Sequence, residues 1–399
     1  MQFLQKFTRI ILFISLSVWL TACGGGGGGD SDSDSHVEDT LSCHSDSGVR
    51  SVAPAADSTG DVYVGGFFQY FNGVSTNYIV RLNSDGSRDN AFEIGSGFDD
   101  LVWSIVPAAD GTGDIYVGGR FRSYNGVSAN YIARLNSDGS LDTGFVTGSI
   151  FHGPVEAITL AADGTGDIYA SGVVRLHSDG SLDNFFNASP SSPSGYSIAR
   201  APLFTGDTYV GGNPSIKRLN SDGSLDIGFV TSGEVGSNNA IVRSIALLAD
   251  GTGDIYVGGF INAEPYKGLF VRLNSDGSQD VAFDPGSGFD GVVESIEPLW
   301  DGTGDIYVGG RFRSYDGVSA NYFIRLNNDG SRENNFLSGG FAGQSEQVMS
   351  IARATDGTDD VYVAGSFGSY RGTEQKGAAR LNSDGSLDTG FAIGEGFCG

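Results

Sequence analysis

Short apolar runs alternate with polar turns along almost the whole chain, and no helical period follows the N-terminal segment. In one representative unit the apolar runs are Val102–Ile105, Ile115–Gly119, Tyr131–Leu135 and Leu141–Phe145. Polar stretches rich in Gly, Asp, Asn and Ser lie between these runs, which is typical of strands separated by turns. The pattern therefore predicts an all-β chain whose units each contain four short strands.

One stretch recurs seven times in the order Arg-Leu-x-x-Asp-Gly-Ser-x-acid-x-x-Phe. In the second copy, Asn136–Ser140 has the chemistry of a hairpin turn in which Gly139 supplies a positive φ. If Gly139 is a bulge residue, Arg134 and Asp142 lie opposite each other on one face, whereas a two-residue loop would make them only diagonal neighbours. The first geometry predicts seven structural ion pairs, which are Arg81 with Asp89, Arg134 with Asp142, Arg175 with Asp183, Arg218 with Asp226, Arg272 with Asp280, Arg325 with Glu333 and Arg380 with Asp388.

Units of about 40–55 residues cannot bury a core alone and must stack on one another. Seven four-stranded units predict a seven-bladed β-propeller, in which radial repetition protects the sheet edges. Adjacent apolar residues such as Ile115-Tyr116-Val117 fit this architecture, because both faces of each blade pack on neighbours. A β-solenoid is the alternative, but its coils usually need fewer residues and stricter spacing.

The segment Asn136–Phe145, together with the Asp-Gly turn at Asp110 and the strand that ends in Gly118-Gly119, resembles the delta-60 repeat, a bacterial β-propeller family. The resemblance covers nearly everything from Val49 to Phe391, although the second turn is longer here and units three and four are shortened. It implies a propeller and carries no catalytic residues to transfer.

The N-terminus has the features of a targeting signal. Basic residues precede an apolar run, Ile10–Leu20, that is too short to span a bilayer, and Leu20-Thr21-Ala22-Cys23 resembles a bacterial lipobox. We therefore expect residues 1–22 to be a signal peptide, Cys23 to be lipidated, and residues 23–42 to be a Gly/Asp/Ser-rich tether before a propeller of residues 43–399. An ordinary cleaved signal or a membrane anchor is the alternative. Gly24 resembles lipoproteins of the outer membrane, so we expect a lipid-anchored protein of the bacterial envelope.

Charge limits the choice of partners. Removal of residues 1–22 leaves 21 basic against 48 acidic residues, a net charge of −27, which would repel nucleic acid and anionic membrane surfaces. Beyond the lipid anchor we therefore expect a glycan or protein ligand, no nucleic acid, and a monomer.

Two cysteines remain once Cys23 carries lipid. In repeat register, Phe391–Cys398 aligns with Phe92–Asp99, so Cys43 and Cys398 should reach the same seam of the ring. A disulfide between them fits an exported protein, and two free thiols are the alternative.

The loops between the second and third strands vary in length and residue type, and variable loops on a rigid scaffold commonly bind ligands. They are long in some units and almost absent from units three and four, which predicts a notch on one side of the ring. Aromatic rings beside amide and guanidinium donors suit a sugar or an extended peptide, although these residues could equally serve only to pack loop against loop. The candidate binding residues are Tyr70, Arg122, Tyr124, Asn125, Tyr266, Arg313, Tyr315 and Tyr370.

Metal and catalytic chemistry have little support. The turn Asn136-x-Asp138-Gly139-x-x-Asp142 looks like a calcium loop, but turn formation and the Arg134 pair already account for its residues. The histidines show no metal-ligand spacing, and no Gly-x-Ser-x-Gly elbow or unique acid–base pair is visible. We therefore expect no cofactor, with calcium as a minor alternative, and no catalytic residues.

These features predict a lipid-anchored β-propeller that acts as a binding module for an extracellular or periplasmic ligand. A scaffold role in an envelope complex is the alternative, and an apolar patch around the notch would favour it. A hydrolase or lyase acting on polysaccharide is the third possibility, and a deep central channel lined by clustered carboxylates would favour that one.

Overall fold

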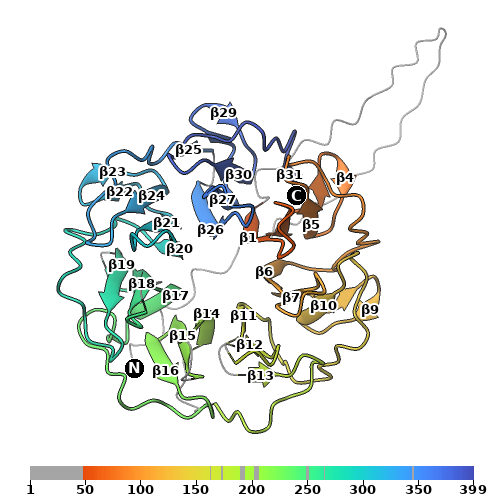
Figure 1. Cartoon of the computed structure of the whole chain (residues 1–399), viewed down its shortest axis with the longest axis horizontal. Coiled ribbons are helices and arrows are strands. Elements are labelled where there is room, and N and C mark those ends of the chain that lie inside the picture. Colours follow the sequence, from red (N-terminus) through yellow and green to blue (C-terminus); the bar gives the residue numbers. More distant parts are fainter. Residues whose placement is uncertain are drawn as a thin grey trace, which may run out of the picture. The chain divides into compact units, whose positions relative to one another are not determined.

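Seven three-stranded antiparallel sheets form the body of the protein, and in this computed structural model they are arranged around one centre (Figure 1). The structure describes residues 48–399 except 162, 172–173, 189–193, 202–205, 249–250, 265 and 344–345. The predicted signal, tether and lipidation residue Cys23 lie outside these residues, and so does Cys43. In the described part of the chain, no helix is long and apolar enough to cross a membrane.

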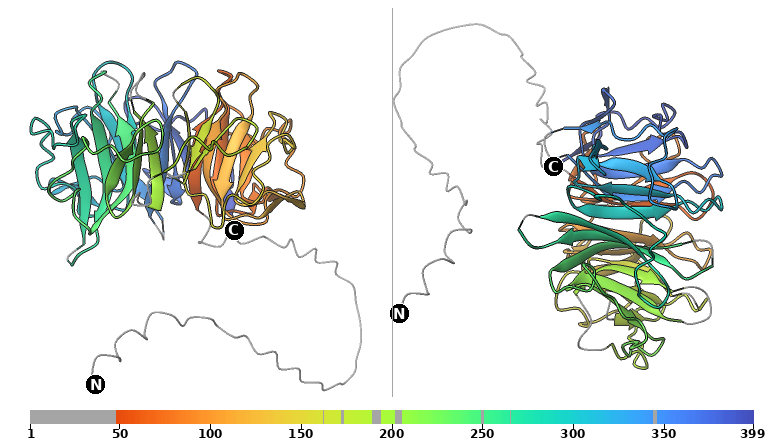
Figure 2. Two further views of the ribbon diagram at one scale, coloured as in Figure 1. Left: turned by 90° about the horizontal axis from the view of Figure 1, so that it is seen from below. Right: turned by 90° about the vertical axis from the view of Figure 1, so that its left-hand side faces the viewer.

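Each sheet has an inner strand that faces the centre, a middle strand and an outer strand (Figure 1). The turns that connect the strands lie at the two opposite ends of each sheet (Figure 2). From inner to outer, the sheets are β1 (Val49–Pro54), β2 (Val62–Gly66), β5 (Ile79–Leu82); β6 (Val102–Pro107), β7 (Ile115–Gly119), β10 (Ile132–Leu135); β11 (Ile158–Leu160), β12 (Ile168–Ala170), β13 (Val174–Leu176); β14 (Ser194–Arg200), β15 (Thr208–Asn213), β16 (Ile216–Leu219); β17 (Ala240–Leu247), β18 (Ile255–Ile261), β19 (Lys267–Leu273); β20 (Val293–Pro298), β21 (Ile306–Gly310), β24 (Phe323–Leu326); and β26 (Gln347–Arg353), β27 (Val361–Ser366), β30 (Ala378–Leu381).

The fourth strand predicted in each unit is reduced to a single bridge, such as Leu135 with Leu141. The chain leaves the sheet soon afterwards and crosses to the next one. After the first unit, for example, the Glu93 backbone N–H donates to the Asp138 carbonyl oxygen of the next turn at 2.7 Å. The crossing segment thus takes the place of a longer fourth strand and lies against the outer side of the following sheet.

Short hairpins connect the middle and outer strands of four units, and two further short strands pair with them. They are β3 (Tyr70–Phe71) with β4 (Val74–Ser75), β8 (Ser123–Tyr124) with β9 (Val127–Ser128), β22 (Ser314–Tyr315) with β23 (Val318–Ser319), β28 (Ser369–Tyr370) with β29 (Thr373–Glu374), β25 (Phe341–Ala342) on β28, and β31 (Phe397–Cys398) on β3.

The core lies between neighbouring sheets. Ala53 and Ile79 of the first sheet pack with Ile105 and Val117 of the second, and all four are buried. The approach is close enough to require glycine: a Cβ on Gly65 would lie 2.8 Å from the Ile105 Cδ1 atom. The Val-Gly-Gly ends of the middle strands therefore serve sheet-to-sheet packing.

The first and last sheets touch in the same way as consecutive sheets. Val52 N–H donates to the Ser350 Oγ at 3.2 Å, just as Ile105 N–H donates to the Ser51 Oγ at 3.1 Å. The C-terminal segment adds to this seam, because β31 pairs with β3 and the Gln69 N–H donates to the Cys398 carbonyl oxygen at 2.8 Å. This is the seam that the sequence register indicates for Cys398.

Candidate functional site

Each repeat arginine lies among carboxylates, and the second copy shows the arrangement. The Arg134 guanidinium lies 2.5 Å from Asp110, 2.9 Å from Asp114 and 3.5 Å from Asp142, and it sits 5.4 Å from the centre of the Tyr116 ring. Asp110 and Asp114 belong to the Asp-Gly-Thr-Gly-Asp turn, and we did not anticipate their role from the sequence. The fixed spacing of that turn in successive units is the signal that could have indicated it.

Six of the seven arginines lie within 4 Å of the expected acid. The nitrogen–oxygen distances are 3.4 Å for Arg81 to Asp89, 3.5 Å for Arg134 to Asp142, 3.4 Å for Arg175 to Asp183 and 3.3 Å for Arg380 to Asp388, and Arg218 with Asp226 and Arg272 with Asp280 are closer still. Arg325 departs from the expectation. It pairs with Asp305 at 2.9 Å, whereas Glu333 accepts a hydrogen bond from the Asn335 backbone N–H, and no ion pair joins Arg325 to Glu333 among the residues that the structure describes.

These acids are occupied by internal contacts. Burial opposes the ionisation of Asp110, but hydrogen bonds from Thr112 and from Arg134 outweigh it and lower the Asp110 pKa. In the described ranges, no group of three or more His, Cys, Asp or Glu is placed to hold a metal ion. The arginine clusters are therefore best explained as fold-stabilising contacts.

Three of the tyrosines expected to bind a ligand are buried, which corrects the sequence interpretation. Tyr124, Tyr315 and Tyr370 expose 1% or less of their surface. The Tyr124 hydroxyl donates to the Gly139 carbonyl oxygen at 2.5 Å, and its ring packs on Phe98. Tyr315 and Tyr370 make the equivalent bonds to Gly330 and Gly385. These side chains therefore fix the hairpin to its own turn and cannot reach a ligand.

The other five candidates are at least partly accessible, but they do not gather in one place. Tyr70 is half-buried, and its backbone pairs with Cys398 at the seam. Arg122 and Asn125 are exposed in unit two, whereas Tyr266 and Arg313 are exposed in units five and six. Unit two is not adjacent to units five and six in the ring (Figure 1).

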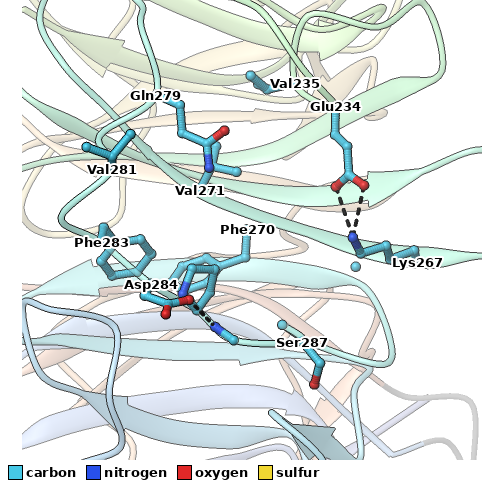
Figure 3. Close-up of a pocket in the computed structure, with 14 residues that line it drawn as sticks. Glu234, Val235, Lys267, Phe270, Val271, Gln279, Val281, Phe283, Asp284 and Ser287 are labelled. Carbon is cyan, nitrogen blue, oxygen red and sulfur yellow. Dashed lines mark hydrogen bonds and ion pairs between the residues drawn. The ribbon is translucent and has the colours of Figure 1, made fainter.

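A cavity of about 450 Å³ lies beside β19, the outer strand of the fifth sheet (Figure 3). Each of its charged groups has a partner within the protein: Lys267 Nζ lies 2.9 Å from a Glu234 carboxylate oxygen, and Asp284 accepts a hydrogen bond from the Gly286 backbone N–H. Phe270 and Phe283 contribute apolar surface. Because no charge is left without a partner among these groups, this cavity is the weaker candidate for a site.

A second cavity, of about 310 Å³, is lined by one residue from each of the seven units. It therefore lies at the centre of the ring, and we call it the central cavity. The seven lining side chains, named here the ring residues, are Arg50, Trp103, Glu156, Tyr196, Arg243, Glu294 and Met349.

The backbone explains why these side chains turn inward. In six inner strands the pairing register shifts at the ring residue, as between Val49 and Ser51 in β1 and between Val102 and Ser104 in β6. Such a bulge leaves one residue out of the ladder and re-aims its side chain. Glu156 holds the corresponding place just before β11.

The charged ring residues differ in what they contact. Glu294 lies 2.8 Å from the Arg311 Nε and 4.0 Å from the Arg243 Nε, and the Arg243 guanidinium also stacks 4.6 Å from the centre of the Tyr196 ring. By contrast, Arg50 and Glu156 form no ion pair within 4.0 Å anywhere in the described part of the chain. The Trp103 indole Nε1 is buried and has no hydrogen-bond partner in the protein.

Burial acts on both unpaired charges. It lowers the pKa of the Arg50 guanidinium, and the nearby Glu294 carboxylate opposes this effect. It raises the pKa of the Glu156 carboxyl, which Arg243 and Arg50 oppose. The shifts record the cost of holding these charges away from water without a close partner. A bound group of opposite charge would offset part of this cost.

Comparison with known families shows what the chain is similar to. A family model described as a domain of unknown function (DUF5122) β-propeller matches residues 58–92, 111–145, 158–186, 247–283, 302–336 and 359–391, which together make up half of the chain. No curated protein matches it in sequence.

Several solved structures share the fold. The chain is 15% identical to the extracellular domain of BT4673 of B. thetaiotaomicron, described as a one-component system, over 84% of this chain and 38% of that one, with a TM-score of 0.53. It is 15% identical to the WD40 β-propeller domain of Doa1 over 80% and 90%, with a TM-score of 0.52, and 12% identical to an ancestral GH74 enzyme over 85% and 46%, with a TM-score of 0.54. At these identities the likeness is one of fold. The chain spans less than half of the BT4673 and GH74 chains that it matches.

Proposed function

The chain belongs to the DUF5122 β-propeller family, and from that premise we propose that it is a ligand-binding module of the bacterial envelope whose ligand enters the central cavity. The observation that carries the proposal is the set of ring residues. They combine two arginines, two glutamates, a tryptophan, a tyrosine and a methionine at one position of an otherwise repeating unit.

The next position along the inner strand provides an internal comparison. It is Ser51, Ser104, Ser197, Ser244, Ser295 and Ser350 in six units, and each hydroxyl oxygen accepts a hydrogen bond from the inner strand of the next sheet. A position that serves only the fold is thus filled by one residue type. The diversity at the ring position favours a role in recognition.

The envelope location is proposed from the sequence of the first 42 residues. The specific proposal is that Cys23 is lipidated and anchors the protein in the outer membrane. Two of the solved structures with a similar fold are described as extracellular domains, in keeping with a site outside the cytoplasm.

We further propose that the seven sheets are the blades of one closed ring and that a disulfide between Cys43 and Cys398 locks its seam. The contacts between the first and last sheets support closure. The cross-link is supported by the position of Cys398, which is buried and pairs with Tyr70 at this seam.

The binding function is tested with the full-length protein in detergent micelles, against panels of glycans, peptides and small metabolites. A ligand of the central cavity should lose at least ten-fold in affinity when Trp103 is replaced by alanine. It should bind normally to Tyr266→Ala, which removes an exposed aromatic outside the cavity. If every ligand found is insensitive to Trp103→Ala, the site lies elsewhere.

A scaffold role is the second candidate, because apolar side chains are exposed on the turns of units three to five. Phe185, Ile227 and Val281 are 92%, 88% and 94% exposed. Replacing all three by serine should abolish cross-linking to a protein partner on intact cells, while leaving binding in the central cavity intact. Unchanged cross-linking would remove the support for this role.

A further inference from the structure

The charges of the ring residues limit the chemical class of ligand that the central cavity can bind. Resting on the binding function proposed above, we propose that this ligand is a small zwitterion, with an anionic group that meets Arg50 and a protonated amine that meets Glu156. An amino acid and an amino-sugar acid share this chemistry.

The first argument is the distribution of charge among the ring residues. Glu294 is already engaged by Arg311 at 2.8 Å and by Arg243 at 4.0 Å. This leaves one cation, Arg50, and one anion, Glu156, without a partner at contact distance in the described chain. Both line the same cavity, but they come from the first and third units, so their own side chains do not close the gap.

The second argument is selection by charge. A neutral molecule would displace water from both groups and pair with neither, which costs free energy. A simple anion would satisfy Arg50 but would meet the carboxylates of Glu156 and Glu294, and a simple amine would face the opposite conflict at Arg50 and Arg243. A molecule that carries both charges is attracted at each end and repelled at neither.

The third argument is the surface between the two charges. Trp103 comes from the second unit, which lies between the units of Arg50 and Glu156 (Figure 1). Its ring offers an apolar face to the body of the ligand. The volume of about 310 Å³ is near the lower end for small-molecule sites. The site therefore suits a molecule of the size of an amino acid or a single sugar better than a polymer.

The test uses isothermal titration calorimetry on the full-length protein in detergent micelles. The probes are the zwitterions glycine, β-alanine, γ-aminobutyrate and δ-aminovalerate, an amino-sugar acid, and three partial mimics: butyrate, butylamine and butyramide. We expect at least one zwitterion to bind ten-fold or more tightly than every partial mimic. The preferred length in the amino acid series would report the spacing between the two charges.

Two variants assign the charges. Glu156→Gln should weaken zwitterion binding at least ten-fold and strengthen binding of butyrate, because it removes the repulsion of an anion. Arg50→Gln should weaken binding of both. Arg371→Gln, which changes an exposed arginine outside the cavity, is the matched control and should change neither.

The outcomes separate this inference from the function on which it rests. Equal zwitterion affinity in the wild type and Glu156→Gln would overturn the zwitterion assignment. Binding of a neutral glycan that depends on Trp103, without binding of any zwitterion, would overturn the assignment and leave the central cavity as the binding site. If no ligand of any class depends on Trp103, both proposals fail.

Discussion

Arg134 shows how one side chain can join three parts of a unit. Its guanidinium contacts Asp110 and Asp114 in one turn and Asp142 after the next, and only 9% of the side chain is exposed. Removing the cation would leave partly buried carboxylates facing one another, which costs more than the loss of an exposed pair.

We therefore expect Arg134→Gln to lower the free energy of unfolding by about 3 kcal/mol. Lys267→Gln is the control, since Lys267 and its partner Glu234 are both exposed, and it should cost less than about 0.5 kcal/mol. Urea denaturation of the two variants measures the difference. Equal losses would show that the arginine cluster does not stabilise the fold.

Glu297, on the inner strand β20, gives a prediction about pH. Burial raises the pKa of its carboxyl to about 8, and the nearby Arg353 opposes the shift. In the unfolded chain the pKa of this carboxyl is about 4.3, so between that pH and pH 8 the folded protein holds a proton that the unfolded chain has lost. Protonated Glu297 therefore contributes fully to the free energy of unfolding at low pH, and this contribution is lost as the pH rises to about 8. Glu297→Gln should therefore become more stable relative to the wild type as the pH is raised from 5 to about 8, with a constant difference above that. Thermal melts across this range measure it, and a difference that does not vary with pH would refute the raised pKa.

At the scale of elements, the repeated turn is the contact point between successive units. The backbone of Glu93 from the first unit lies against Gly139, where an added Cβ would be 2.9 Å from the Glu93 backbone nitrogen. The φ of Gly126 is +73°, similar to the +88° of Gly139, but no atom lies within 4 Å of the place where a Cβ on Gly126 would be. Alanine at Gly126 would therefore measure the cost of backbone strain alone, whereas alanine at Gly139 would measure strain together with the clash with the crossing segment.

Alanine at Gly126 should cost about 1 kcal/mol from the left-handed backbone alone. Alanine at Gly139 should cost about 2 kcal/mol more, because the crossing segment must also shift. Chemical denaturation of both variants is the measurement. If the two substitutions cost the same, the crossing segment does not press on the turn.

The same elements show what the sequence could predict. Alternating apolar runs and Asp-Gly turns identified three strands in each unit, because they determine local structure. The fourth strand was overestimated, since Leu141 and Phe145 read as a strand but the chain departs after one bridge. Tyr124 was misassigned because its hydroxyl partner, the Gly139 carbonyl, is revealed only by the folded hairpin.

The ring position can be recognised from the sequence. Five residue types occupy this position in the seven units, with Arg and Glu each occurring twice, while the neighbouring positions are mostly Val and Ser, and this contrast is visible in the sequence. What the sequence could not give was the bulge, which turns these residues toward a common centre and leaves Arg50 and Glu156 without close partners.

At the scale of the whole molecule, closure depends on its last segment. Ala392 N–H donates to the Asp85 carbonyl oxygen at 2.8 Å, the same bond that each crossing segment makes to the turn of the next unit. The C-terminus thus fastens the last unit to the first, and a disulfide at this seam would constrain the unfolded chain over nearly its full length.

Reduction should therefore lower the melting temperature of the wild type and have no effect on Cys43→Ser, which lacks the cross-link in either condition. Scanning calorimetry with and without reductant measures the effect, and thiol titration counts the free cysteines. An unchanged melt together with two titratable thiols in the untreated protein would exclude the disulfide.

The central claim is that a ligand binds among the ring residues, and Trp103 reports on this directly. In the full-length Trp19→Phe/Trp300→Phe protein, Trp103 is the remaining tryptophan, so its fluorescence can be followed during titration with the zwitterion, acid, amine and neutral probes. The account predicts a saturable change in Trp103 emission with at least one probe, and its loss in the Arg50→Gln background. Probes that bind by calorimetry yet leave Trp103 emission unchanged, or the absence of any response across the whole set, would contradict it.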